Sequence, residues 1–179
     1  MISKTTILKS ENLHLRIPSL DDIESTFSAT RFPGFNDGML WEPPKDKSEL
    51  IAPYHRTIQA WEIGEAYSFT IERKETEDFL GRISIRKTKE DKVWDVGFWT
   101  HPAHWGKGIM TEALAIIVKF GFEQLEARRI EACHATWNKA SEKVLQKNRM
   151  TFVKFIEQGF KKHGKWVPEN QYAIEFENW

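Results

Sequence analysis

Several short segments of the chain alternate hydrophobic and polar residues, and a two-residue period of this kind predicts strands. In NLHLRIP, for example, Leu13, Leu15 and Ile17 are separated by polar neighbours. Short charged links, KETED and KTKED, join three of the segments in the way that hairpin connections do. The pattern predicts about seven strands, over residues 12–18, 66–73, 79–87, 92–100, 129–137, 151–160 and 172–179.

Other segments repeat their hydrophobic residues with the period of an amphipathic helix. The clearest helix follows Gly108 and ends near Leu125. Ser19 is a suitable N-cap for an earlier helix, which has acidic residues in its first turn. Pro53 either bends the next helix or belongs to its first turn. The predicted helical regions, about four, are residues 19–27, 46–64, 109–125 and 138–148.

The order of these elements predicts a mixed α/β (α+β) fold. An antiparallel meander comes first, and a helix, a strand, a second helix and a closing hairpin follow. The strand at 92–100, the long helix and the strand at 129–137 form a crossover, which makes the two strands parallel neighbours. No repeat, low-complexity tract or flexible linker divides the sequence, so we expect a single domain over residues 1–179. Ligands of open α/β sheets bind at the carboxyl ends of such strands.

Composition narrows the classes of function. The 179 residues carry 26 Lys and Arg against 26 Asp and Glu, a balance without the basic excess that is typical of nucleic-acid-binding proteins. Cys133 is the single cysteine, so no intramolecular disulfide can form. The sequence has no secretory hydrophobic segment at its start and no apolar run of about 18 residues. We therefore expect a cytoplasmic protein with no membrane segment and no nucleic-acid partner.

Two glycines, Gly106 and Gly108, stand one residue apart between the predicted strand at 92–100 and the long helix. A P-loop is excluded because no glycine stands at position 101, and a dinucleotide-binding fingerprint is excluded because Thr111 replaces its third glycine. The remaining phosphate-binding interpretation is a nest of backbone N–H groups at a helix N-terminus, suited to a pyrophosphate. An ordinary tight turn between strand and helix is the alternative.

The segment HPAHWGKGIMTEA, followed further along by WNKAS, resembles the GNAT acetyltransferase superfamily, and more closely its ribosomal-protein N-terminal acetyltransferase branch (RimJ/RimL). The predicted strand order agrees with the GNAT fold over essentially the whole chain. The resemblance implies a mixed, mostly antiparallel sheet with a central splayed parallel pair. The residues that match the two motifs of the branch are Pro102, Trp105, Gly106, Gly108, Thr111, Glu112, Ala113, Asn138 and Ser141.

Acetyl-coenzyme A is the co-substrate that this resemblance implies, with no metal ion. Its pantetheine arm is expected to pair with backbone groups of Phe98, Trp99 and Thr100 in the gap between the splayed strands, and with the side-chain amide of Asn138. A second role for Asn138 is to N-cap the helix that follows it. The pyrophosphate is expected on the glycine loop, whose cofactor-binding residues are Trp105, Gly106, Lys107, Gly108, Ile109, Met110 and Thr111.

The implied reaction is direct attack of an amine on the thioester, without an acyl-enzyme. Ser141 matches the family position that supplies a hydroxyl to the departing thiolate. Asp95 is the best candidate for a general base, acting directly or through water, although a surface carboxylate on a strand explains it equally well. His134 and Glu157 are weaker candidates. Cys133, the single thiol, lies in the middle of a strand, where a cysteine is usually buried and inert.

The expected acceptor is a primary amine, and an N-terminal α-amine suits a site without a strong base. An α-amine titrates near ~8, whereas a lysine amine titrates near ~10.4 and needs more help to lose its proton. The alternatives are acetylation of a small amine, such as an antibiotic or a polyamine, and a catalytically silent acyl-coenzyme A-binding module. The loop RFPGFNDGMLWEPP, residues 31–44, either walls the acceptor groove or covers the core. A monomer and a homodimer both fit.

Two local features bear on the site. His101 and His104 form an H-x-x-H pair, but no third ligand stands at a metal-binding spacing. Arg149 stands where the branch usually has a glycine after the second helix. Because a non-glycine residue in a left-handed C-cap costs about 1 kcal/mol, we expect the turn at Arg149 to differ from the usual one.

Overall fold

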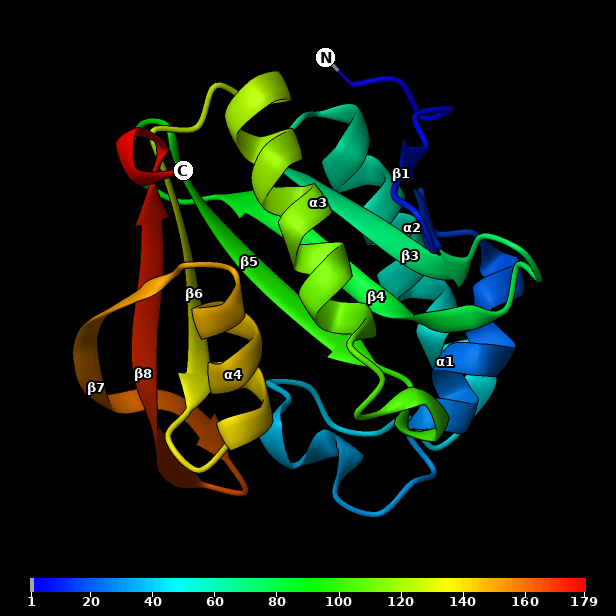
Figure 1. Ribbon diagram of the computed structural model, residues 1–179. Coiled ribbons are helices and arrows are strands. Elements are labelled where there is room, and N and C mark those ends of the chain that lie inside the picture. The colour runs from blue at the N-terminus through cyan, green and yellow to red at the C-terminus, as the bar shows by residue number, and fades with distance from the viewer. Residues whose placement is uncertain (1) are drawn as a thin grey trace.

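One eight-stranded sheet crosses the computed structural model, which describes residues 2–179 (Figure 1). Neighbouring strands follow the order β1-β2-β3-β4-β5-β6-β8-β7, and within the described residues only the pair β5–β6 is parallel. The strands are β1 (Leu8–Lys9), β2 (Leu13–Arg16), β3 (Ala66–Arg73), β4 (Phe79–Lys87), β5 (Val93–Thr100), β6 (Arg129–Ala135), β7 (Thr151–Lys162) and β8 (Lys165–Glu175).

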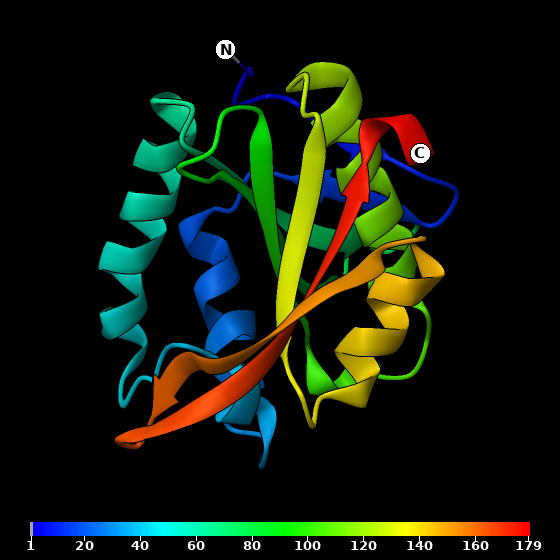
Figure 2. The ribbon, with the colours of Figure 1, turned by 90° about the vertical axis from the view of Figure 1, so that its left-hand side faces the viewer.

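Helices cover both faces of this sheet. The pair α3 and α4 lies on one face, and the pair α1 and α2 lies on the other (Figures 1 and 2). Pro53 is the third residue of α2, so it belongs to the first turn of that helix. Among residues 2–179, no helix combines the length and the hydropathy needed to cross a membrane. The helices are α1 (Ile23–Ala29), α2 (Ile51–Glu62), α3 (Ile109–Gln124) and α4 (Lys139–Lys147).

The predicted strands and helices are all present, and the sheet has one strand more than expected. The extra strand, β1, has two residues, too few to show a hydrophobic period. Strand β8 begins at Lys165, well before the predicted start at residue 172. It contains Pro168, which cannot donate a ladder hydrogen bond. The strand continues past Pro168 because β7 and β8 change register there, between the pairs Ile156–Glu169 and Phe160–Val167.

The parallel strands β5 and β6 are paired at their starts only. Their register begins at Val93–Arg129 and ends at Asp95–Glu131. Beyond that point β5 remains paired with β4 as far as Thr100, and β6 remains paired with β8 as far as Ala135. The two strands therefore diverge toward their carboxyl ends (Figure 1), and we call the gap between them the fork. The expected splayed parallel pair is confirmed.

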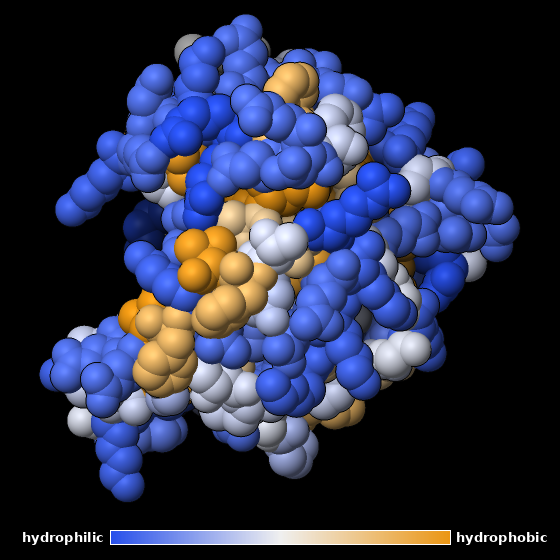
Figure 3. Space-filling model, turned by 60° about the vertical axis from the view of Figure 1, so that its left-hand side comes forward, coloured by the Kyte–Doolittle hydropathy of each residue, from blue (hydrophilic) through white to orange (hydrophobic). Residues whose placement is uncertain are grey.

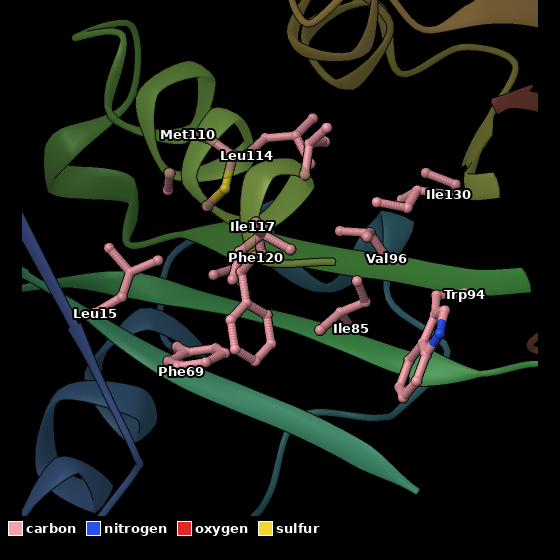
Figure 4. Packing of buried hydrophobic residues seen from close by; sticks show 14 of the residues in the cluster. Leu15, Phe69, Ile85, Trp94, Val96, Met110, Leu114, Ile117, Phe120 and Ile130 are labelled. Carbon is pink, nitrogen blue, oxygen red and sulfur yellow. The ribbon is translucent and has the colours of Figure 1, made fainter. Parts of the chain in front are cut away.

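The long helix α3 packs directly onto the sheet beside the fork. At Gly121 a Cβ atom would lie 2.6 Å from Ile130 Cδ1 and 2.9 Å from Ile85 Cδ1, so the helix approaches β4 and β6 as closely as a glycine allows. Figure 4 shows the helix side chains that face the sheet. These buried contacts fix the direction in which the N-terminus of α3 points. The helix residues labelled there are Met110, Leu114, Ile117 and Phe120.

A buried carboxylate ties the start of α1 to the other face of the sheet. Asp22 is 4% exposed and accepts hydrogen bonds from Arg16 Nη2 at 2.7 Å, Thr70 Oγ1 at 2.6 Å and the Ser19 backbone N–H at 3.0 Å. Burial alone would raise the pKa of Asp22, but the hydrogen bonds from Arg16, Thr70 and Ser19 outweigh it and lower the pKa below its ordinary value. The ionised carboxylate thus anchors α1 to β2 and β3.

The turn after α4 keeps the left-handed geometry that we expected Arg149 to abolish. Arg149 has φ 60°. Its N–H donates to Gln146 O, and the Met150 N–H donates to Leu145 O, which is the Schellman pattern. Leu145 and Met150 are both buried, and their packing holds the turn in place. The expectation of a different turn was therefore wrong, because tertiary contacts compensate for the strain.

Replacing Asp22 with asparagine should destabilise the protein by about 3 kcal/mol at neutral pH, because the amide removes the charge that pairs with Arg16. A carboxylate with a lowered folded-state pKa contributes stability above its unfolded pKa, and the contribution is lost as pH falls through the folded pKa. The difference in unfolding free energy between wild type and Asp22→Asn, measured by urea titration, should therefore shrink below about pH 4.

Asp21→Asn is the matched control, because Asp21 is adjacent but exposed. It should change the free energy of unfolding by less than about 0.5 kcal/mol. If Asp22→Asn were no more destabilising at pH 7 than Asp21→Asn, the anchoring role of Asp22 would be refuted.

Candidate functional site

The loop between β5 and α3 is held in shape by its own polar groups. The Trp105 indole N–H donates to Thr100 O at 2.8 Å, and Lys107 Nζ donates to Ala103 O at 3.2 Å. Gly106 and Gly108 have φ values of 75° and 76°, in the left-handed region that favours glycine. A Cβ atom at either position would have no heavy atom within 4 Å. The backbone of this loop therefore faces open space.

Backbone donors converge on that open space. In α3 the first carbonyl to accept a helical hydrogen bond is Gly108 O, which receives the Glu112 N–H at 3.2 Å. Within residues 2–179, no backbone carbonyl accepts from the N–H groups of residues 106–111, and no side chain caps this helix. The free N–H groups carry the positive end of the helix dipole. An anion of phosphate type is the ligand that this arrangement fits best.

The carboxyl ends of the forked strands lead to the two halves of the predicted cofactor site. Strand β5 continues into the glycine loop, and β6 continues into α4, which begins after Asn138 (Figure 1). Phe98, Trp99 and Thr100 lie on β5 beyond the last residue that pairs with β6. Alternate residues of a strand direct their backbone groups to opposite edges, so some of these groups face the fork.

Asn138 and Ser141 lie together at the start of α4. The Asn138 side-chain oxygen accepts the Ser141 backbone N–H at 3.1 Å, so Asn138 is the N-cap of the helix. This cap uses the carbonyl oxygen of the amide only. The amide nitrogen faces Gly38, where a Cβ atom would lie 3.4 Å away. The capping role is confirmed, and the second role, contact with a cofactor, stays a prediction.

Asp95 lies at the closed end of the fork, as the last residue of β5 that pairs with β6. Its neighbours Trp94 and Val96 belong to the core on the α3 side, so its side chain lies on the opposite face of the sheet. Arg86 contacts Asp95 Oδ2 through Nε at 2.6 Å and Nη2 at 2.5 Å. Burial raises the pKa of Asp95, the Arg86 charge opposes the rise, and Glu131 adds to it. Such a carboxylate is a better base than an exposed one.

The other candidate residues have different environments. Cys133 is exposed, so the expectation of a buried thiol was wrong. Partial desolvation and the carboxylates of Glu169, Asp95 and Glu131 raise the pKa of Cys133 to about 12, which keeps the thiol protonated at neutral pH. His134 is buried, its Nδ1 donates to Ala135 O at 2.8 Å, and its Nε2 has no partner among the described residues.

The two histidines of the H-x-x-H pair make contacts within the loop between β5 and α3. His101 Nδ1 accepts the Ala103 N–H at 3.2 Å, and the rings of His101 and His104 are 5.8 Å apart. Across residues 2–179, no three His, Cys, Asp or Glu side chains are grouped as a metal site would require. Glu157 is exposed on β7.

Glu112 belongs to the matched motif, but no role for it was predicted from the sequence. Its carboxylate accepts from Ser10 Oγ at 2.6 Å and from the Asn12 backbone N–H at 3.1 Å, and these bonds lower its pKa against the opposing effect of burial. It thereby ties the first turn of α3 to the β1–β2 turn. Its position in the first turn of a helix was the available signal, but its partners are about a hundred residues away.

The loop at residues 31–44 lies against the end of β5. The Phe35 ring packs edge-on against Trp99, with ring centroids 5.3 Å apart and an interplanar angle of 85°. Gly38 packs so closely on the α4 side that a Cβ atom would lie 3.4 Å from Trp137 Cη2. Phe35 is buried at this contact, so the two interpretations of the loop, an acceptor wall and a cover of the core, both stay predictions. Figure 3, in which the left-hand side of Figure 1 comes forward, shows a band of hydrophobic residues across a mainly hydrophilic surface.

Comparison with known proteins agrees with this architecture. The model of the acetyltransferase (GNAT) domain family matches residues 12–151. The uncharacterized N-acetyltransferase p20 of Bacillus licheniformis is 34% identical over 148 residues, which are 82% of each chain. The uncharacterized N-acetyltransferase YoaA of Bacillus subtilis is 25% identical over 175 residues, which are 94% of this chain and 96% of the relative.

Solved structures show the same fold. A GNAT-family acetyltransferase from Bacillus anthracis superposes with a TM-score of 0.86 at 21% identity, over 96% of this chain and 99% of the other. RimL, described as a ribosomal L7/L12 alpha-N-protein acetyltransferase in complex with coenzyme A, superposes with a TM-score of 0.87 at 19% identity, over 97% and 100%. Since the matched family model spans the fork, the glycine loop and α4, the chain belongs to the GNAT acetyltransferase family and is an N-acetyltransferase.

Proposed function

We propose that this N-acetyltransferase uses acetyl-coenzyme A and transfers the acetyl group to the α-amine at the N-terminus of a peptide or protein. The observation that carries the proposal is the set of free backbone N–H groups at residues 106–111, which face open space at the end of the fork. The similar fold of RimL, which is described with coenzyme A and an α-N-protein activity, supports the same ligand and acceptor class. A cytoplasmic location follows from the proposed substrates.

In this proposal the free N–H groups bind the pyrophosphate of coenzyme A, because the missing side chains at Gly106 and Gly108 let phosphate oxygens reach the backbone. The pantetheine arm lies in the fork, where its amides pair with backbone groups of β5 at Phe98, Trp99 and Thr100. The Asn138 amide nitrogen, which the N-cap does not use, contacts the same arm. The loop residues assigned to cofactor binding are Trp105, Gly106, Lys107, Gly108, Ile109, Met110 and Thr111.

Catalysis by direct attack of the amine on the thioester then has two requirements: the departing thiolate must be stabilised, and the attacking amine must lose a proton. The departing thiolate, with a pKa near ~8.5 for a free thiol, accepts a hydrogen bond from the Ser141 hydroxyl. Asp95 receives the proton of the attacking amine, directly or through water. Arg86 occupies only Oδ2 of this carboxylate, which leaves Oδ1 to act as the base. The high pKa of Cys133 argues against a covalent acyl-cysteine.

Gly108→Ala should weaken the affinity for coenzyme A by about tenfold or more, because the methyl group projects into the space assigned to the pyrophosphate. Gly164→Ala is the matched control, since Gly164 has φ 77° and open space around it but lies in the β7–β8 turn. Calorimetry should find unchanged affinity in the control. Wild-type affinity in a folded Gly108→Ala protein would remove the pyrophosphate from this loop.

Ser141→Ala should lower kcat by roughly 10²-fold while KM for acetyl-coenzyme A changes little, because a bond to the thiolate strengthens only in the transition state. Ser141→Thr, which keeps a hydroxyl, should retain more activity. Steady-state measurement of thiol release gives both constants. An unchanged kcat in Ser141→Ala would reduce this serine to a helix residue.

The acceptor class is tested with two matched peptides, one with a free N-terminus and one with a blocked N-terminus and a lysine. Release of thiol should occur with the first peptide, and kcat/KM should rise with pH and level off near the α-amine pKa of ~8. A lysine acceptor would continue to gain activity above about pH 9. Preference for the blocked peptide would overturn the α-amine proposal, and coenzyme A binding without turnover of any amine would indicate a silent binding module.

Asp95→Asn in the same assay measures the contribution of the base. A base acts when it is deprotonated, so its raised pKa moves the acid limb of the wild-type profile above the ordinary range of aspartate. The variant should lose that limb and should lose up to about 10²-fold in kcat/KM near pH 7. A profile identical to that of wild type would exclude Asp95 as the base.

A further inference from the structure

One buried lysine connects the hairpin of β7 and β8 to the loop at residues 31–44. Lys162, the last residue of β7, has a side chain that is 8% exposed. Its Nζ donates to Met39 O at 3.2 Å and to Trp41 O at 3.1 Å, and it lies 3.1 Å from Glu42 Oε1. Figure 2 shows the hairpin tip reaching across the sheet toward the segment that follows α1. We call these three contacts the lysine clamp.

The clamp gives the buried ammonium group two hydrogen bonds and one ion pair. Burying an ammonium is costly unless its charge and its N–H donors have partners. Two backbone carbonyls and one carboxylate, all from the same loop, supply these partners. The neighbouring Lys161 behaves differently, because it is exposed and its Nζ lies 5.0 Å from the Trp166 ring centroid. Lys162 is therefore buried because it contacts the loop, and not because this end of β7 is buried as a whole.

The clamped segment borders two residues that the proposed function assigns to the cofactor, Trp99 and Asn138. Phe35, four residues before Met39, packs against Trp99 of β5, and its centroid is 6.1 Å from that of Trp41. Gly38, the residue next to Met39, lies against the amide nitrogen of Asn138. A shift of the clamped carbonyls would therefore move the side chains that pack against the end of β5 and the start of α4.

The same segment contains a buried donor without a partner. Asn36 is 9% exposed, and its amide nitrogen has no hydrogen-bond partner among the described residues. Leaving a buried donor unpaired costs free energy, so a shift of this segment that gave the Asn36 amide a carbonyl partner would gain a hydrogen bond.

We propose that Lys162 is a positioning residue for the amine acceptor: the lysine clamp holds residues 39–42 so that Phe35 stays on Trp99 and the acceptor wall keeps its shape. This inference rests on the proposed function, because it assigns the loop to the acceptor side of the same site. It predicts that loss of the clamp impairs acceptor binding more strongly than the binding of acetyl-coenzyme A.

The test compares Lys162→Met with the matched control Lys161→Met in the full chain, using the free-N-terminus peptide and acetyl-coenzyme A. The acceptor KM of Lys162→Met should rise about tenfold, because the clamp contributes hydrogen bonds of ordinary strength to the closed loop. The affinity for acetyl-coenzyme A, measured by calorimetry, should stay within about twofold. Lys161→Met should match wild type in both constants.

Hydrogen exchange supplies a readout that is independent of turnover. The Asp37 N–H donates to Gly34 O and the Met39 N–H donates to Asn36 O, so both amides report on loop closure. Both should exchange faster in Lys162→Met than in Lys161→Met. Glu42→Gln, at a side chain that is 58% exposed, removes only the ion pair and gives a smaller change in the same direction if Lys162→Met fails to fold.

An unchanged acceptor KM in folded Lys162→Met would overturn the positioning role. A loss of acceptor binding that parallels an equal loss of coenzyme A affinity would also overturn it, because it indicates general damage to the structure. If wild type acetylates no amine, the proposed function fails, and the exchange rates then test only whether Lys162 holds the loop in place. Unchanged exchange at Asp37 and Met39 in Lys162→Met would refute that holding role, and faster exchange would support it.

Discussion

The site depends on the pairing of β5 with β4 and of β6 with β8, which separates β5 from β6. The two strands begin as parallel neighbours, but β5 follows β4 and β6 follows β8, and their own pairing ends at Asp95 and Glu131. The inner edges beyond this point have no strand partner within residues 2–179. Backbone groups in such a position require water or a ligand as their partner. In our account this requirement makes the fork a binding site for an amide-rich arm.

Two contacts fix the position of α3, and with it the position of the glycine loop at the open end of the fork. Gly121 lets α3 approach Ile130 and Ile85, and Glu112 ties the first turn of α3 to the β1–β2 turn. With the helix axis held, the free N–H groups of the glycine loop keep one direction. Preorganised donors of this kind bind an anion without a reorganisation cost, and this is why a backbone nest can replace basic side chains in a chain of zero net charge.

Most of the fold could be predicted from local patterns in the sequence. Periodicity identified the strands and helices, and the order strand, long helix, strand implied the parallel pair, because these signals depend on near neighbours. The loop glycines and the Asn138 cap were visible for the same reason. What the sequence could not show are contacts between distant segments, such as Ser10 on Glu112 and Lys162 on Met39. The left-handed Arg149 was misjudged because buried neighbours, and not local preference, decide its turn.

A crystal structure of the protein with coenzyme A would show directly whether the fork binds the cofactor. Pyrophosphate oxygens should lie within hydrogen-bond distance of the N–H groups at residues 106–111, and the pantetheine arm should lie between β5 and β6 beyond Asp95. A pyrophosphate bound elsewhere on the surface, or an arm that passes outside the fork, would show that the divergence of these two strands does not create the binding site.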